Sequence, residues 1–179
     1  MGHQPKLLLP LADGRPLLWH TASNALILGP KEVIVVTRPD LPDLAVAVSD
    51  LKVRCIPNYR YAEGLGTSLA AGIGVLQEGT EAALVMLGDE PYVNPSIIEA
   101  IMAAYEKERK PITMPLYGDR PGPPTLFARE IFSELLKLEG DTGGRQLAQK
   151  HPDRVCFAPF DEAIRPKDID TQEDYQAIL

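Results

Sequence analysis

Five short apolar runs constrain the fold of this chain more than any other feature. They span residues 32–37, 53–57, 82–87, 112–116 and 155–158. Each run is apolar and partly β-branched, and it does not alternate between apolar and polar residues. We therefore expect strands that are covered on both faces, which is typical of a parallel sheet.

The segments between these runs have helical spacing. Helices are expected at residues 18–29, 43–49, 67–76 and 95–108, the last behind a cap at Asn94. This alternation predicts an α/β fold with right-handed crossovers and a doubly wound, mostly parallel sheet in three layers. The glycine- and proline-rich residues 118–124 are expected to form a loop. With 179 residues, the chain is expected to be a single domain, residues 1–179.

Charge and composition narrow the class of partner. The chain has 18 Lys and Arg residues against 25 Asp and Glu residues, a net charge of −7, so as a whole it repels nucleic-acid phosphates. No apolar run approaches the ~18 residues of a membrane span. The two cysteines, Cys55 and Cys156, have neither metal-binding nor redox spacing. We expect a cytoplasmic protein that binds neither nucleic acid nor membranes.

An acidic residue directly follows the most apolar of the predicted strands. Asp89 lies in the sequence Leu-Gly-Asp-Glu-Pro at residues 87–91. Ligands of open α/β sheets bind beyond the carboxyl ends of the strands, so Asp89 is well placed to hold Mg²⁺ through its carboxylate oxygens. Gly88 permits close approach of the backbone to a ligand. The alternative is a turn or cap aspartate before Pro91.

A second acidic group lies near the end of the chain, at residues 168–171 (Asp-Ile-Asp-Thr). Its candidate metal ligand is Asp170. The alternative is a helix cap, since Thr171 has Asp174 three residues further on. Both can hold at once, with Asp170 facing the metal and Thr171 capping the helix. We expect the carboxylates of Asp89 and Asp170 to approach within bridging reach of Mg²⁺.

Two glycine-containing segments are candidates for ligand binding. Residues 63–68 (Glu-Gly-Leu-Gly-Thr-Ser) lead into a predicted helix, whose first N–H groups can bind an anion or the polar edges of a nucleotide. Residues 140–145 (Gly-Asp-Thr-Gly-Gly-Arg) combine an acid, a base and three flexible positions. The alternatives are an ordinary helix start for the first segment and a salt-bridged loop for the second.

Five motifs follow one another in a definite order along the chain. They are residues 6–18 (KLLLPLADGRPLL), 64–68, 88–91, 140–145 and 168–175. In this order they resemble the nucleotidyltransferases of the molybdenum-cofactor type, over nearly the whole chain. The resemblance implies a Rossmann-like fold and transfer of a nucleoside monophosphate from a nucleoside triphosphate to a terminal phosphate, with release of pyrophosphate. The D-I-D-T and G-D-x-G-x-R motifs are closer to the molybdopterin cytidylyltransferase branch than to the guanylyltransferase branch.

The resemblance also implies roles for individual residues. Lys6 matches a lysine that contacts the triphosphate, and Asp89 matches an aspartate that binds Mg²⁺, with Asp170 as a second metal contact. The residues implied to bind the nucleotide are Gly2, Lys6, Asn58, Gly64, Gly66, Ser68 and Gly88. Those implied to hold the phosphorylated acceptor are Asp141 and Arg145. The implied partners are CTP in preference to GTP and an acceptor of the molybdopterin type.

The chain differs from the family pattern at two places. The family opens with a strand and a glycine-rich loop, L-A-A-G-x-S-x-R-M-G, of which only Met1 and Gly2 are matched here. Pro123 stands where the family has a histidine. Because the loop cradles the phosphates, we expect this chain to bind nucleoside triphosphate weakly or not at all.

The opening strand of such a sheet lies centrally, between the strands expected at residues 32–37 and 82–87. Three arrangements can replace it: these two strands pair directly, residues 7–11 move in, or another copy of the chain supplies a strand. We expect the first or the third, because Pro10 suits a central strand poorly.

Three functions stay open from the sequence. The first is cytidylyl transfer to a molybdopterin-type cofactor. The second is a binding module that keeps the fold without catalysing transfer. The third is guanylyl transfer, or cytidylyl transfer to a sugar or an isoprenoid precursor.

Overall fold

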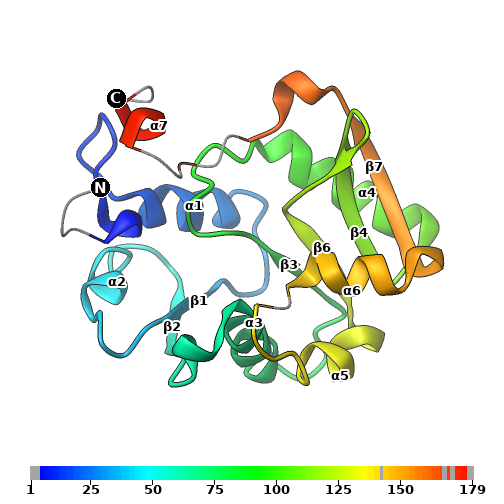
Figure 1. Cartoon of the computed structure of the whole chain (residues 1–179), viewed down its shortest axis with the longest axis horizontal. Coiled ribbons are helices and arrows are strands. Elements are labelled where there is room, and N and C mark those ends of the chain that lie inside the picture. Colours follow the sequence, from blue (N-terminus) through cyan, green and yellow to red (C-terminus); the bar gives the residue numbers. More distant parts are fainter. Residues whose placement is uncertain (1–4, 142, 167–168, 170–171, 177–179) are drawn as a thin grey trace.

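The computed structural model of the chain describes residues 5–141, 143–166, 169 and 172–176 and has an α/β fold (Figure 1). The strands are β1 (Ile34–Thr37), β2 (Arg54–Pro57), β3 (Ala82–Val85), β4 (Ile112–Tyr117), β5 (Arg120–Pro121), β6 (Thr125–Ala128) and β7 (Val155–Phe160). The helices are α1 (Leu17–Leu26), α2 (Asp43–Val46), α3 (Leu65–Gly74), α4 (Pro95–Glu108), α5 (Phe132–Leu135), α6 (Gly144–Lys150) and α7 (Gln172–Gln176). The expected strands and helices are confirmed, with ends that differ by a few residues.

The sheet is mixed, so the expectation of a mostly parallel sheet is wrong. Strands β1 and β2 pair in parallel in a small sheet, and a larger sheet has the order β3-β6-β4-β5 with β7 also paired to β4. Strand β6 runs antiparallel to β3 and β4, whereas β7 runs parallel to β4. The physical reason is the segment that follows β4. Gly118 takes a left-handed turn at φ 60°, and the chain returns as β5 and then β6.

Two of the three possible replacements for the opening strand lie within one chain, and neither of these is observed. Strand β1 pairs with β2 and strand β3 pairs with β6, and among the described residues neither strand has a ladder partner on its other edge. Direct pairing of β1 with β3 is therefore wrong. Residues 7–11 do not substitute either, since they belong to the 3₁₀ helix η1 (Lys6–Leu8) and to a bridge between Pro10 and Pro16. Pairing with another copy of the chain stays a prediction.

Hydrogen bonds at the two ends of the small sheet show which groups of β1 lie on its open edge. The Arg54 N–H donates to the carbonyl of Val33, and the Asn58 N–H donates to the carbonyl of Thr37. Residues that alternate along a strand point their backbone groups to the same side. The backbone N–H and C=O groups of Ile34 and Val36 therefore point away from β2.

Strand β3 also has an open edge, to which alternate residues point their backbone groups. The Arg129 N–H donates to the carbonyl of Glu81 at 2.7 Å, so Glu81 faces β6 and the backbone groups of Ala82 and Leu84 face the open edge. All four residues of β3 are only half-buried. Strand β3 is thus apolar in sequence yet less covered than a fully enclosed strand.

Helices α1 and α3 lie on opposite faces of β1. Val35 packs with Leu18 and Ala22 of α1, whereas a Cβ atom on Gly72 of α3 would lie 3.3 Å from the Val36 side chain. Adjacent residues of a strand point to opposite faces, so the two helices enclose β1 from both sides. Figure 1 shows α1 and α3 separated by the region of β1 and β3.

The larger sheet is also covered on both faces. Leu126 packs with Ile97 and Ile101 of α4, and its neighbour Phe127 packs with Ile73 of α3 on the opposite face. Helix α4 starts where the sequence indicates, at a cap in which the Asn94 side chain accepts from the Ser96 N–H. Within the described residues, no helix has the length and apolar character that crossing a bilayer would require.

The open edges predict an alternating pattern of hydrogen exchange. The amides of Val36 and Leu84 should exchange faster than those of Thr37 and Val85, because the latter donate into ladders and the former do not. Residue-resolved hydrogen exchange by NMR measures this directly. Equal protection of all four amides would contradict the open edges and would indicate that a partner strand pairs with them in solution.

Candidate active site

Helix α1 holds the turn that follows β3. The Thr21 hydroxyl donates to the carbonyl of Gly88 at 3.0 Å, and the Asn24 side-chain amide donates to the carbonyl of Pro91 at 2.7 Å. Thr21 and Asn24 are three residues apart, so they lie on one face of the helix. Neither residue belongs to a motif of the sequence, and their spacing as polar positions beside an apolar stripe is the signal that points to them. Their hydrogen bonds fix the backbone on both sides of Asp89.

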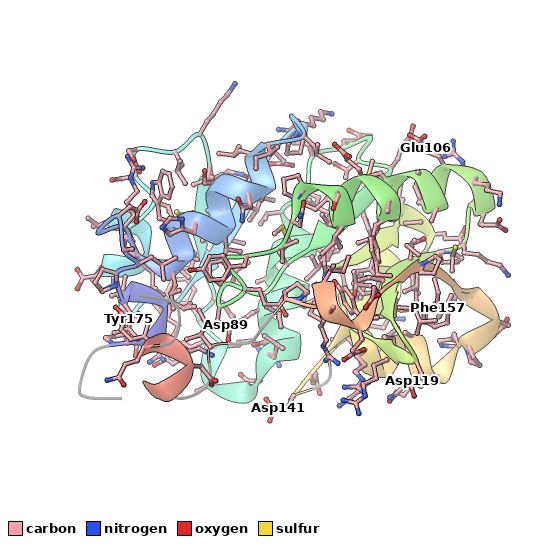
Figure 2. All side chains as sticks on the ribbon, turned by 90° about the horizontal axis from the view of Figure 1, so that it is seen from above. Asp89, Glu106, Asp119, Asp141, Phe157 and Tyr175 are labelled. Carbon is pink, nitrogen blue, oxygen red and sulfur yellow. The ribbon has the colours of Figure 1, made fainter. Side chains whose placement is uncertain are left out.

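Lys6 and Asp89 form an ion pair at this turn. The Lys6 Nζ lies 2.6 Å from the Asp89 Oδ2, and the two side chains are 24% and 27% exposed. Next to them, a Cβ atom on Gly88 would lie 3.4 Å from both Leu7 and Leu18, so η1 and α1 pack closely over the turn. The structure thus brings together the two residues predicted to be catalytic, 83 positions apart in the sequence. In Figure 2, Asp89 lies on the side of the molecule that carries Tyr175 and away from Glu106 and Phe157.

The residues at this turn fit a divalent cation through one carboxylate. The Lys6 ammonium already occupies a cation position against Asp89. Within the described parts of the chain, no group of three or more His, Cys, Asp or Glu side chains could hold a metal ion. A cation at Asp89 would therefore take most of its oxygen ligands from phosphates and water, as Mg²⁺ commonly does. Asp170 and Gly2 lie outside the described residues.

The C-terminal segment packs against the N-terminal segment that carries Lys6. Ile169 is 1% exposed and packs with Leu11 and Leu17. The Tyr175 hydroxyl of α7 donates to the carbonyl of Pro10. In Figure 2, Tyr175 lies at the same end of the molecule as Asp89. The two ends of the described chain therefore meet near the candidate site.

Asn58 organises the segment that leads into α3. Its side-chain amide donates to the hydroxyls of Thr67 at 2.9 Å and Ser68 at 3.0 Å, and its carbonyl oxygen accepts from the Arg60 N–H at 2.9 Å. Asn58 is 4% exposed. Both donor hydrogens of the amide are used within the protein, so Asn58 shapes this segment. Direct contact of Asn58 with a nucleotide stays a prediction.

The two glycine-containing segments are in direct backbone contact at the start of α3. The Gly66 N–H donates to the carbonyl of Gly140 at 2.9 Å, and the Leu65 N–H donates to the Asp141 carboxylate at 3.4 Å. Gly64 has φ 113°, and a Cβ atom there would lie 2.2 Å from the carbonyl carbon of Gly140. Only glycine allows this approach. Asp141, predicted to hold the acceptor, thus lies beside the segment predicted to hold the nucleotide.

Arg145 lies in a different part of the molecule. It is exposed on α6, where it lines a groove of about 310 Å³ together with Met114, Pro121 and Phe157. Figure 2 shows Phe157 well apart from Asp89. The structure therefore does not bring the Arg145 groove to the Lys6–Asp89 pair, and contact of Arg145 with the acceptor stays a prediction.

A buried acid lies directly after Asp89. Glu90 is 2% exposed. The burial of Tyr117, and to a lesser extent the charge of Glu90, raises the pKa of Tyr117. The Tyr117 hydroxyl donates to the carbonyl of Pro123 at 3.0 Å. Tyr117 thus holds the loop in which Pro123 replaces the histidine of the expected pattern.

Comparison with known proteins identifies the family. Residues 1–155 match the MobA-like NTP transferase domain. The chain belongs to this family. The bifunctional protein GlmU of Clavibacter sepedonicus is 31% identical over 168 residues, which make up 90% of this chain and 34% of that protein. The chain therefore spans about a third of the length of that relative.

Solved structures agree with membership of the MobA-like family. Rv0371c of Mycobacterium tuberculosis H37Rv, in a complex with manganese, matches with a TM-score of 0.82 and 26% identity over 99% of this chain and 92% of that one. The synthetase of CMP:2-keto-3-deoxy-manno-octonic acid, in a complex with CTP, matches with a TM-score of 0.77 over 97% of this chain and 89% of that one. The two sequences are 15% identical, so this similarity shows the fold alone.

The contact between Gly64 and Gly140 predicts a large effect of a single methyl group. Gly64→Ala should lower the free energy of unfolding by about 1–3 kcal/mol more than Gly79→Ala, through steric overlap with the Gly140 backbone. Gly79 is the matched control, since it also has positive φ, 81°, but a Cβ atom there meets nothing within 4 Å. Chemical denaturation of both variants measures the difference. Equal losses would show that positive φ alone accounts for the effect.

Proposed function

We propose that the protein transfers CMP from CTP to the terminal phosphate of a molybdopterin-type acceptor and releases pyrophosphate. The observation that carries the proposal is the contact between Lys6 and Asp89 at 2.6 Å, beyond the carboxyl end of β3. It joins a residue suited to bind phosphate with a residue suited to bind a cation. Membership of the MobA-like NTP transferase family supports nucleotidyl transfer, and the G-D-x-G-x-R and D-I-D-T motifs support cytidylyl transfer.

The proposed chemistry needs charge neutralisation and positioning more than acid or base catalysis. An oxygen of the acceptor phosphate forms a bond to the α-phosphorus of CTP, the bond from that phosphorus to the bridging oxygen breaks, and pyrophosphate leaves. The attacking oxygen is already anionic, so no strong base is required. When bound at Asp89, Mg²⁺ supplies positive charge against the phosphate oxygens. Lys6 stabilises the negative charge that develops as the α-phosphate reacts.

The segment at the start of α3 is the proposed site for the base and ribose. Asn58 holds the hydroxyls of Thr67 and Ser68, and Gly64 and Gly66 are held against Gly140. A segment fixed in this way presents its backbone groups in one arrangement, which favours selective binding of a nucleotide. The adjacent Asp141 is proposed to face the acceptor. Arg145 would reach the acceptor only if the acceptor extends toward α6.

Nucleotide-dependent stabilisation tests the proposal on the 179-residue chain. A ligand at ten times its Kd stabilises the folded state by about 1.4 kcal/mol, which raises Tm by roughly 3–6 °C in a domain of this size. Millimolar CTP with Mg²⁺ should raise Tm more than GTP with Mg²⁺ does. An equal or larger shift with GTP would remove the cytidylyl assignment, and no shift with either nucleotide would contradict nucleotidyl transfer.

A substitution at Asp89 tests the cation part of the proposal. Asp89→Asn should abolish the Mg²⁺-dependent part of the Tm shift and leave the folded structure intact, because the amide has the same shape as the carboxyl group. Glu106→Gln is the matched control, since Glu106 is an exposed acid on α4 that lies far from Asp89 in Figure 2. The proposal is contradicted if both variants retain the full shift.

A further inference from the structure

In the Lys6–Asp89 ion pair, each side chain takes the place of the ligand proposed for the other. In the proposed function Lys6 binds phosphate and Asp89 binds a cation, yet in this structure the two side chains bind each other at 2.6 Å. We propose that this ion pair is a latch: a divalent cation that binds Asp89 displaces the Lys6 ammonium from it, and Lys6 then binds the triphosphate. The inference deepens the proposed function, because it takes from it the two ligands of this site.

The backbone around both residues is held, so the exchange does not require movement of either backbone segment. The N–H of Leu9 donates to the carbonyl of Lys6 at 3.1 Å, and the N–H of Leu17 donates to the carbonyl of Leu9 at 2.9 Å, which ties η1 to the start of α1. The turn that carries Asp89 is held by the hydrogen bonds of α1 described above. Lysine has a flexible four-carbon stem, so its ammonium can leave Asp89 without unfolding either segment.

Because the site is largely shielded from solvent, Lys6 competes with a metal cation for the carboxylate of Asp89. Both side chains are about three-quarters shielded from solvent, and a carboxylate with restricted hydration favours a nearby positive charge. The ammonium supplies that charge when no metal ion is bound. A divalent cation therefore has to displace it, and the apparent affinity of Asp89 for the cation is lowered by the strength of the pair.

Thermodynamic reciprocity gives the latch a functional consequence. If the cation frees Lys6 for phosphate, phosphate binding to Lys6 must free Asp89 for the cation by the same factor. Cation and nucleotide are then bound together more strongly than either is alone. The latch thereby disfavours a complex in which CTP lies at the site without its metal ion.

Binding of Mn²⁺ in the absence of nucleotide tests the competition directly. Lys6→Met and Lys6→Gln should each tighten Mn²⁺ binding to the full chain by about five-fold or more, the lower end of typical coupling between sites. Electron paramagnetic resonance of free Mn²⁺ measures this without any assay of activity. The control is Lys52→Met, which removes an exposed lysine from the loop before β2 and changes the net charge equally. Unchanged binding in the Lys6 variants, or a change no larger than in the control, would overturn the latch.

A double-mutant cycle tests the release of Lys6. With EDTA present, Asp89→Asn should tighten CTP binding in the chain that retains Lys6 but not in the Lys6→Met background. The reason is that only Lys6 can exchange its contact with Asp89 for a contact with the CTP phosphates. Calorimetry at millimolar CTP measures the four affinities. Equal tightening in both backgrounds would mean that Asp89 merely repels the nucleotide, and the latch would be wrong.

The two experiments separate the latch from the proposed function. Tightened Mn²⁺ binding in the Lys6 variants supports the competition even if neither CTP nor GTP binds, in which case the proposed function fails by itself. CTP binding with an unaltered Mn²⁺ affinity in those variants supports the proposed function and rejects the latch.

Discussion

The candidate site depends on how tightly the turn after β3 is held. A turn at the end of a half-buried strand would otherwise have the freedom of a surface loop, and Asp89 would have no defined direction. Two hydrogen bonds from α1 fix its backbone on both sides, and the packing of Leu7 over Gly88 brings η1 alongside. Lys6 reaches Asp89 only because η1 lies there. The pair is thus a product of packing around the turn.

Helices α1 and α3 join the two separate sheets of the molecule. Strands β1 and β3 are not hydrogen-bonded to each other in the described structure, so no continuous ladder joins the two sheets. Helix α1 packs against Val35 and also bonds to the turn after β3, while α3 packs against Val36 and places Ile73 in the core of the larger sheet. Side-chain packing on both faces holds the two sheets together, as backbone hydrogen bonds do in a continuous sheet. The Lys6–Asp89 pair lies at the turn that α1 holds.

Glycine determines how the two glycine-containing segments, residues 63–68 and 140–145, meet. The carbonyl of Gly140 reaches the first turn of α3 because Gly64 has no Cβ atom. The contact places the Asp141 carboxylate 3.4 Å from the N–H of Leu65, and the side chain stays exposed to solvent. A loop and a helix start, each ordinary in isolation, are thereby joined by direct backbone contact.

The sequence by itself determined the local elements and the position of Asp89. Apolar runs and helical spacing depend on neighbouring residues, so they predicted β1 to β4, β7 and α1 to α4, and they placed Asp89 directly after a strand. The ordered motifs indicated a nucleotidyltransferase, and the comparison established the MobA-like NTP transferase family, whereas the molybdopterin cytidylyltransferase branch stays a prediction. The C-terminal metal contact at Asp170 stays a prediction, because it lies outside the described residues.

Only the tertiary structure decided which strand edges meet and which polar groups are already used. Strand β6 is four residues long and follows a proline-rich turn, so its place between β3 and β4 depends on pairing energies that local spacing does not contain. The hydrogen bonds of Asn58 and the separation of Arg145 from Asp89 likewise depend on contacts between distant segments. Sequence spacing shows which residues can share an element, whereas the packing of elements decides which of them share a site.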